Sequence, residues 1–259
     1  MSDSSHPQKS LNASPRRLWA EIAIVLALSL GATAVYSIVA IWNRLTMEAA
    51  LSEQTATLHR PLSERELFDL IYQFLDVFFD FAPVALVVFL LWRSAAPRLG
   101  ALGIDFTRPG RDFAWGAGLV VAIGVPGILL YIAGRELGVT VQVVPTALDA
   151  HWWTTPILLL SALRAGVTEE VIVVGYLFER LRRIGWGTWT IILSTALLRG
   201  TYHLYQGFGA FVGNIAMGVL FGWLYSRFGR LLPLIIAHTL IDAVIFIGYP
   251  WAATTFDWL

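Results

Sequence analysis

Long apolar segments place this chain in the membrane. A bilayer core needs about 20 apolar residues for each helix that crosses it, and roughly seven such segments follow one another along the chain. Hydrophobic residues make up 57% of the 259 residues and charged residues 14%, whereas a soluble domain carries about a quarter charged residues. The sequence therefore predicts an all-α fold, a polytopic bundle of transmembrane helices. The predicted spans run approximately over Trp19–Trp42, Leu67–Trp92, Phe113–Ala133, Trp153–Phe178, Trp189–Tyr205, Phe208–Tyr225 and Leu231–Tyr249.

Two of these segments bear on the number of spans. The fourth contains Arg164, Glu169 and Glu170, so it is either one long broken helix or two segments, and an eighth span is the alternative. The first could be a signal peptide, because small residues at 32–34 follow its apolar start, but its apolar run continues to Trp42 without a break. The sequence favours an uncleaved first span.

The positive charges predict the orientation. Loops that stay in the cytoplasm carry an excess of lysine and arginine. Here these residues precede the first span and gather after the second, fourth and sixth, whereas the opposite loops mix a few arginines with glutamates. We therefore predict a multi-pass protein of the cell membrane, with its N-terminus in the cytoplasm and its C-terminus outside. Residues 46–66 become the largest external loop.

Composition excludes several classes of function. The chain has no cysteine, so it has no thiolate metal site and no cysteine nucleophile. Its formal net charge is zero and its basic residues are spread between apolar runs, which leaves no electrostatic footprint for a nucleic acid. The lipid bilayer is the predicted surrounding, and no nucleic acid is expected as a partner.

Charged residues inside the predicted spans are the strongest functional signal. Each costs about 2.5 to 3.5 kcal/mol on insertion scales, so each needs a partner or a function. Residues three or four apart share one face of a helix, which groups these residues into stripes that face the bundle interior. They are Asp69, Asp76 and Asp80 on the second span, Arg164, Glu169 and Glu170 on the fourth, Arg199 and His203 on the fifth, and His238 and Asp242 on the seventh.

Two interpretations divide this set. Arg164 with Asp76 or Asp80 is most simply a buried ion pair that holds two helices in register. The acidic and imidazole residues of the fourth, fifth and seventh spans lie on the order of 12 to 20 Å deep, at 1.5 Å per residue, and so within reach of one cavity. An ion pair that holds two helices in register does not require two glutamates, two histidines and an aspartate. We therefore interpret them as a site.

The spacing of these residues resembles that of a membrane protease family. Glu169 and Glu170 begin the first block, His203 stands in the second, and His238 with Asp242 forms the third. Their order and membrane context are similar to the EExxxR, FxxxH and HxxxN or HxxxD motifs of the CPBP family, which comprises CAAX proteases and Abi-type bacteriocin-processing and immunity proteins. The resemblance covers the segment 161–246.

Two positions depart from the family pattern. The arginine of the first motif falls at Val174, and the phenylalanine of the second falls at Arg199. One position has lost an arginine and the other has gained one. We infer a relocation, in which Arg199 offers its planar fork to the carboxylate of Glu170. The expected activity therefore depends on a contact between Arg199 and Glu170.

The resemblance implies an activity and a role for each residue. An intramembrane endopeptidase of this type would hydrolyse a peptide bond near the C-terminus, or in a membrane-associated segment, of a peptide or protein substrate. Glu169 would activate a water that His203 positions. His238 would donate to the oxyanion, and Asp242 would orient His238 or act in its protonated form, with Glu170 in support. No cofactor is expected; the alternative is zinc or another divalent metal on Glu169, His203 and His238.

These implications divide the chain into four parts. They are a disordered cytoplasmic tail at 1–15, N-terminal transmembrane helices at 16–150, a CPBP-like catalytic bundle at 151–250 and a short C-terminal tail at 251–259.

Two other functions stay open at this point. A non-catalytic immunity or scaffold protein would keep the fold, and the departures at Val174 and Arg199 are its best support. A proton-coupled transporter would use acidic residues of the second and fourth spans as a relay. That function predicts an inverted repeat with matching broken helices, and the sequence contains no such repeat.

Overall fold

The described residues fold almost entirely into α-helices. The computed structural model describes residues 14–91 and 99–248, so nearly all of the predicted tail at 1–15 and all of the tail at 251–259 lie outside the described residues. In chain order the elements are α1 (Pro15–Ala27), α2 (Leu30–Leu45), η1 (Leu51–Glu53), β1 (Thr55–His59), α3 (Glu66–Phe79), α4 (Ala82–Leu91), η2 (Leu99–Leu102), α5 (Pro109–Glu136), β2 (Gln142–Thr146), α6 (Thr154–Glu169), η3 (Glu170–Tyr176), α7 (Leu177–Ile184), α8 (Thr188–His203), η4 (Leu204–Gln206), α9 (Phe208–Phe228), α10 (Leu232–Ala243) and η5 (Val244–Gly248).

Each predicted span coincides with one helix or with consecutive helices, but few of these are long enough to cross a bilayer alone. Three segments are long and apolar enough, namely 66–91, 109–136 and 208–228. The pair α1 and α2, bent by 56°, makes a fourth if it is one span. The nearly all-α fold, with helices apolar enough to cross a membrane, is therefore confirmed, whereas a count of seven or eight spans stays a prediction.

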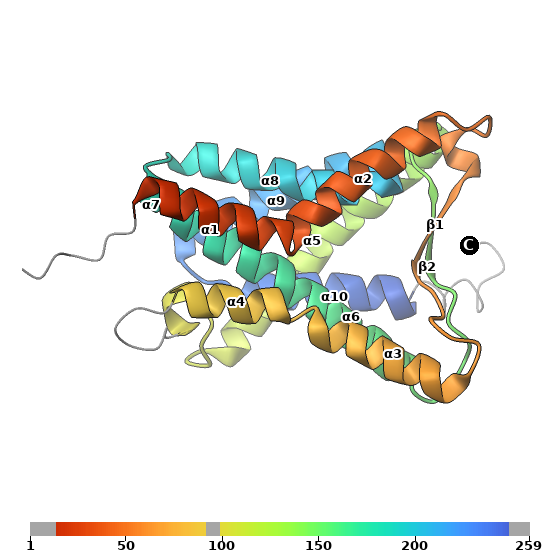
Figure 1. Cartoon of the computed structure of the whole chain (residues 1–259), viewed down its shortest axis with the longest axis horizontal. Helices are drawn as coiled ribbons and strands as arrows, with labels where there is room; N and C mark the ends of the chain where they lie inside the picture. The colour runs from red at the N-terminus through yellow and green to blue at the C-terminus, as the bar shows by residue number, and fades with distance from the viewer. Residues whose placement is uncertain (1–13, 92–98, 249–259) are drawn as a thin grey trace, which may run out of the picture.

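Helices α6 to α10 form the central packing unit. A Cβ at Gly218 would lie 2.8 Å from the Cα of Ala196, and one at Gly166 would lie 3.0 Å from the carbonyl oxygen of Ile235. Glycine therefore lets α9 approach α8, and α6 approach α10, at close range. Figure 1 shows α2 and α3 diverging toward one end of the molecule, the end at which β1 and β2 lie.

The helix that carries the glutamate pair changes its winding at that pair. α6 ends at Glu169, and the seven residues from Glu170 to Tyr176 form the π-helical η3, all of them buried. Residues 171–174 are β-branched, which crowds an α-helix, and Gly175 follows them. A π segment inside an α-helix is frequent at functional sites. The change of winding places the widened turn directly after Glu169.

A short parallel β-ribbon corrects the prediction that 46–66 is a loop. β1 pairs with β2 in parallel, with Thr55 opposite Gln142 and His59 opposite Thr146. The sequence Thr-Ala-Thr-Leu-His alternates weakly, and in the described residues its partner strand comes only after α3, α4, η2 and α5. Strands this short give little periodic signal, so the pairing could not be predicted from the sequence.

The ribbon joins two parts of the helix bundle. At one end, Ala56 and Val141 are buried in a cluster with Ile41, against Leu204 and Tyr205. At the other end, the His59 ring packs edge-on against Phe246, with ring centroids 4.4 Å apart. Burial lowers the pKa of His59, so its imidazole is neutral near pH 7. The ribbon spans the end at which α2 and α3 diverge (Figure 1).

Candidate active site

Three helices bring the predicted site residues together. α6 contributes Glu169 at its last position, α8 contributes Arg199 and His203 in its last turns, and α10 contributes His238. The close packing of α10 on α6 and of α8 on α9 fixes their separations. The 3.6-residue period of each helix directs these side chains toward the space between the helices.

Glu170, Arg199 and His238 form a fully buried polar cluster. The Arg199 Nη2 atom lies 2.5 Å from Glu170 Oε1, and the His238 Nδ1 atom lies 2.8 Å from the same oxygen. The exposed fractions of the three residues are 0%, 0% and 5%. The contact between Arg199 and Glu170 is the pair that the relocated arginine predicts. The cluster joins the end of α6 to both α8 and α10.

Glu169 lies beside this cluster with a different set of neighbours. The Tyr202 hydroxyl donates a hydrogen bond of 2.6 Å to Glu169 Oε2. The same oxygen lies 3.8 Å from His203 Nε2 and 4.0 Å from His238 Nε2. Both separations are too long for a direct hydrogen bond. Within the described residues, Glu169 Oε1 has no hydrogen-bond partner.

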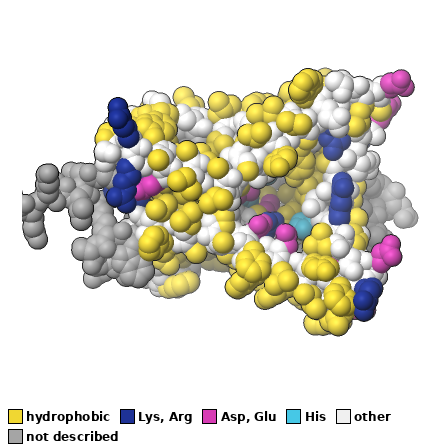
Figure 2. Space-filling view, viewed as in Figure 1, with side chains coloured by type: hydrophobic (Ala, Val, Ile, Leu, Met, Phe, Trp, Pro, Cys, Tyr) yellow, Lys and Arg dark blue, Asp and Glu magenta, His cyan; other side chains and the backbone are white. Residues whose placement is uncertain are grey.

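His203 and Asp242 are the more accessible members of the site. Their side chains are 20% and 17% exposed. Asp242 Oδ2 lies 3.6 Å from His238 Nε2, one turn along α10. Neither ring nitrogen of His203 has a hydrogen-bond partner among the described residues. Figure 2 shows a hollow on one face of the molecule in which acidic, basic and histidine side chains gather between apolar surfaces.

The second predicted stripe lies on the wall toward α3 and α4. Arg164 forms an ion pair with Asp80, so the predicted register pair is present, and Asp80 rather than Asp76 is the partner. Further along α3, the amide of Gln73 donates to Asp69 and to the backbone carbonyl of Arg60, which fixes the start of that helix. The ion pair and the Gln73 contacts are separate from each other, and within the described residues neither includes a hydrogen bond or ion pair to Glu169.

Tyr202 is the site residue that the sequence analysis missed. It lies three residues after Arg199 and so on the same face of α8, but the sequence analysis considered only charged and imidazole side chains inside the spans. It is 2% exposed. A signal was available, because a buried tyrosine hydroxyl usually has a hydrogen-bond partner and Tyr202 lies next to a block of acidic and imidazole residues.

The geometry bears on the metal alternative. Among the residues described, no group of three or more histidine, aspartate or glutamate side chains is arranged to hold a metal ion. Glu169 Oε2 lies 3.8 and 4.0 Å from the Nε2 atoms of His203 and His238, and the Nδ1 atom of His238 is held by Glu170. A carboxylate on the second ring nitrogen is also common for a metal-binding histidine, so the metal alternative stays a prediction.

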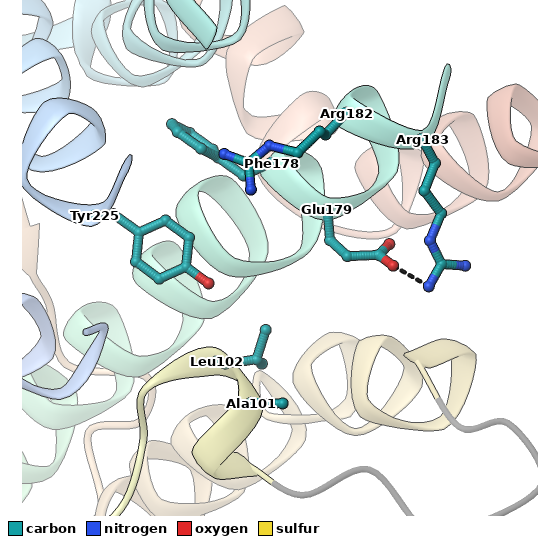
Figure 3. Close-up of a pocket in the computed structure, with 7 residues that line it drawn as sticks. All are labelled: Ala101, Leu102, Phe178, Glu179, Arg182, Arg183 and Tyr225. Atoms are coloured by element: carbon teal, nitrogen blue, oxygen red, sulfur yellow. Dashed lines mark ion pairs between the residues drawn. The ribbon is translucent and has the colours of Figure 1, made fainter. Parts of the chain in front are cut away.

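A separate cavity of about 300 Å³ lies away from these residues, beside α7. It is lined by Ala101, Leu102, Phe178, Glu179, Arg182, Arg183 and Tyr225, and Glu179 is ion-paired with Arg183 across part of it (Figure 3). None of the predicted site residues lines it. Its walls come from the helix ends that carry the arginine-rich loops.

The comparison with protein families finds a match, and it covers the segment that contains these residues. Residues 151–244 match the family model of the Type II CAAX prenyl endopeptidase Rce1-like proteins. The matched segment runs from the start of α6 to the end of α10 and contains all of the predicted site residues. No curated protein and no solved structure is significantly similar to the chain.

Proposed function

Because residues 151–244 match the CPBP/CAAX protease family, we propose that this chain is an intramembrane endopeptidase that uses glutamate and histidine directly. Its substrate would be a membrane-associated peptide or protein, cut near its C-terminus or within a membrane segment. The observation that carries the proposal is the convergence of Glu169 with His203 and His238, from three helices, at 3.8 and 4.0 Å.

Glu169 acts as the general base in this proposal. A water between Glu169 and His203 gives its proton to the carboxylate as its oxygen attacks the scissile carbonyl. The new C–O bond yields a tetrahedral intermediate, and the proton passes from Glu169 to the leaving amine as the C–N bond breaks. The free Oε1 of Glu169 can take up a proton without breaking the hydrogen bond from Tyr202 to Oε2.

His238 stabilises the oxyanion, and its contact with Glu170 determines which protonation form of the imidazole can do so. With its Nδ1–H bound to Glu170, a neutral imidazole would present only a lone pair at Nε2, which repels an oxyanion. His238 must therefore be doubly protonated to donate from Nε2. The carboxylates of Glu170 and Asp242, at 2.8 and 3.6 Å, favour that form. Asp242 serves in this way as the counter-charge that orients His238.

We propose seven spans in the cell membrane, with the N-terminus cytoplasmic and the C-terminus external. The ribbon supports the proposed number of spans in the N-terminal half of the chain, because two paired strands must lie on the same side of the membrane. The chain between β1 and β2 then crosses an even number of times, which the segments 66–91 and 109–136 provide as two spans. A reporter fused after Leu259 should read external, and a cytoplasmic reading would contradict the orientation.

The relocated arginine bears on the non-catalytic alternative. The departures at Val174 and Arg199 would favour a scaffold if Glu170 lacked its arginine, but Arg199 occupies that position at 2.5 Å. The transporter alternative has less support, since Arg164 and Asp80 neutralise each other. Neither alternative explains why two glutamates and two histidines lie together.

The test is a hydrolysis assay on the purified full chain in detergent. The probes are a peptide ending in a prenylated cysteine with three further residues, and a set of apolar peptides, with new termini read by mass spectrometry. Wild-type protein should cut at least one probe. Glu169→Gln and His203→Ala should each lower the rate by about 100- to 10,000-fold, with unchanged melting profiles. Wild-type activity in Glu169→Gln would refute the base assignment, and loss of wild-type activity with a chelator would favour the metal alternative.

A further inference from the structure

Tyr202 makes the shortest contact to the proposed base. Its hydroxyl lies 2.6 Å from Glu169 Oε2, and the residue is 2% exposed, so no solvent competes for that hydrogen bond. The other neighbours of this oxygen stand between 3.8 and 4.0 Å away. Tyr202 is therefore the one side chain among the described residues that holds the carboxylate by a direct hydrogen bond.

We propose that Tyr202 is a positioning residue, whose hydroxyl fixes the Glu169 carboxylate so that Oε1 faces the substrate-bound water. The inference rests on the proposed peptidase function. A carboxylate can rotate about its last torsion, since that torsion has broad minima. Anchoring one oxygen removes this freedom and leaves the other oxygen to act on the water. Preorganisation of this kind is what makes a base effective in a closed site.

The backbone of Tyr202 is itself anchored from outside the family-matched segment. Ser37 of α2 donates a hydrogen bond of 2.9 Å to the Tyr202 carbonyl oxygen, and its hydroxyl accepts one of 3.3 Å from the Tyr205 backbone amide. Ser37 is 2% exposed. It thereby bridges the last turn of α8 and η4, the turn that also carries His203. The N-terminal helices thus contribute to the geometry of the site through one hydroxyl group.

A purely structural role for Tyr202 predicts a different outcome from a positioning role. If the hydrogen bond only joins α8 to α6, its loss lowers stability, and activity falls only with the folded fraction. If it positions Glu169, its loss lowers the rate of the chemical step in folded enzyme and leaves substrate binding alone. The split between kcat and KM separates the two roles.

The experiment compares Tyr202→Phe with wild type on whichever peptide probe the wild-type protein cuts. Tyr202→Phe keeps the ring and removes only the hydroxyl. We expect kcat to fall about 10- to 100-fold, with KM unchanged and the melting temperature close to wild type. Ser37→Ala should also lower kcat, by a smaller factor, because Ser37 contacts the backbone of Tyr202 and not Glu169 itself.

Two controls make the result specific. Tyr176→Phe removes the hydroxyl of another fully buried tyrosine, which lies under the Arg180 guanidinium at 5.2 Å instead of on Glu169, and it should keep wild-type kcat. Glu169→Gln runs in the same assay. Full kcat in Tyr202→Phe, beside an inactive Glu169→Gln, would overturn the positioning role and leave the peptidase proposal intact. Equal cleavage by wild type and Glu169→Gln would overturn both.

Discussion

Two of the arginine–carboxylate pairs that join helices among the described residues differ in burial. Arg199 and Glu170 link α8 to the start of η3 with both side chains at 0% exposure. Arg164 and Asp80 link α6 to the turn between α3 and α4, with side chains 27% and 49% exposed. The first pair shares its carboxylate with His238. The second pair has no further partner of that kind among the described residues.

Burial determines the role of each pair. Removing one partner of a buried pair leaves an unpaired charge without solvent, whereas water in the hollow can solvate the survivor of a half-exposed pair. The buried pair therefore commits α8 and α10 to one arrangement around Glu170. The half-exposed pair sets the register of two helices and leaves the wall of the hollow adjustable. The predictions that follow test this contrast.

The largest effect is expected from breaking the buried pair. Arg199→Ala and Glu170→Ala should each lower the free energy of unfolding by about 3 to 5 kcal/mol, measured by thermal unfolding in detergent. The double variant should lose much less than the sum, because the second change removes an orphaned charge. Additive losses would show that the two residues do not act as a pair.

The family arrangement can be restored in the second test. Val174→Arg combined with Arg199→Phe returns the arginine to the position four residues after Glu170, within one turn of the same helix. This combined variant should recover most of the stability that Arg199→Ala loses, because either position addresses the same carboxylate. Arg199→Phe alone is the matched control and should stay destabilised. Equal stability of the combined variant and that control would contradict the relocation.

A smaller effect is expected at the half-exposed pair. Arg164→Ala or Asp80→Ala should lower the free energy of unfolding by about 0.2 to 1 kcal/mol, the range of exposed ion pairs. Their losses should shrink further at high salt, since accessible charges are screened. A loss as large as that of Arg199→Ala would mean that the hollow is closed to water, and the contrast between the pairs would fail.

The smallest effect concerns an ion pair outside the helical spans. Hydrogen bonds from Thr107, together with Arg230 at 2.8 Å, lower the pKa of Asp105 from 3.8 to about 2. Because the folded-state pKa is depressed, this contribution is present above about pH 4 and is lost as the pH falls toward 2. The melting temperatures of wild type and Asp105→Asn should therefore converge over that range. A constant difference across it would contradict the assignment.

The sequence predicted these charged contacts better than it predicted the backbone. Arg199 and Arg164 were assigned correctly because a charge in an apolar span has few partners within reach, and helical periodicity narrows the choice to one face. Between Asp76 and Asp80 the sequence could not choose, since both lie on the same stripe of α3 and its cap. The outcome depends on the turn between α3 and α4.

Three other features of the structure could not be predicted from sequence periodicity. Tyr202 carries no charge that would single it out inside an apolar span, and its role depends on its distance to a residue of a different helix. The π-helical turn after Glu169 follows from crowding of buried side chains that only the packed structure reveals. The ribbon depends on strands separated, in the described residues, by α3, α4, η2 and α5. Tertiary contacts decide all three, and local patterns do not encode them.

The parallel ribbon also sets an order for biosynthesis. β1 leaves the ribosome before α3, α4 and α5 have been made, and β2 follows them. A parallel partner cannot come from an adjacent hairpin, so the first strand has no partner strand until the segment 60–141 has been made. Chain closure across such a distance is slow compared with helix formation. The ribbon therefore forms late in synthesis. Until β2 has been made, the unpaired edge of β1 in the nascent chain is available to a chaperone or to a second copy of the chain.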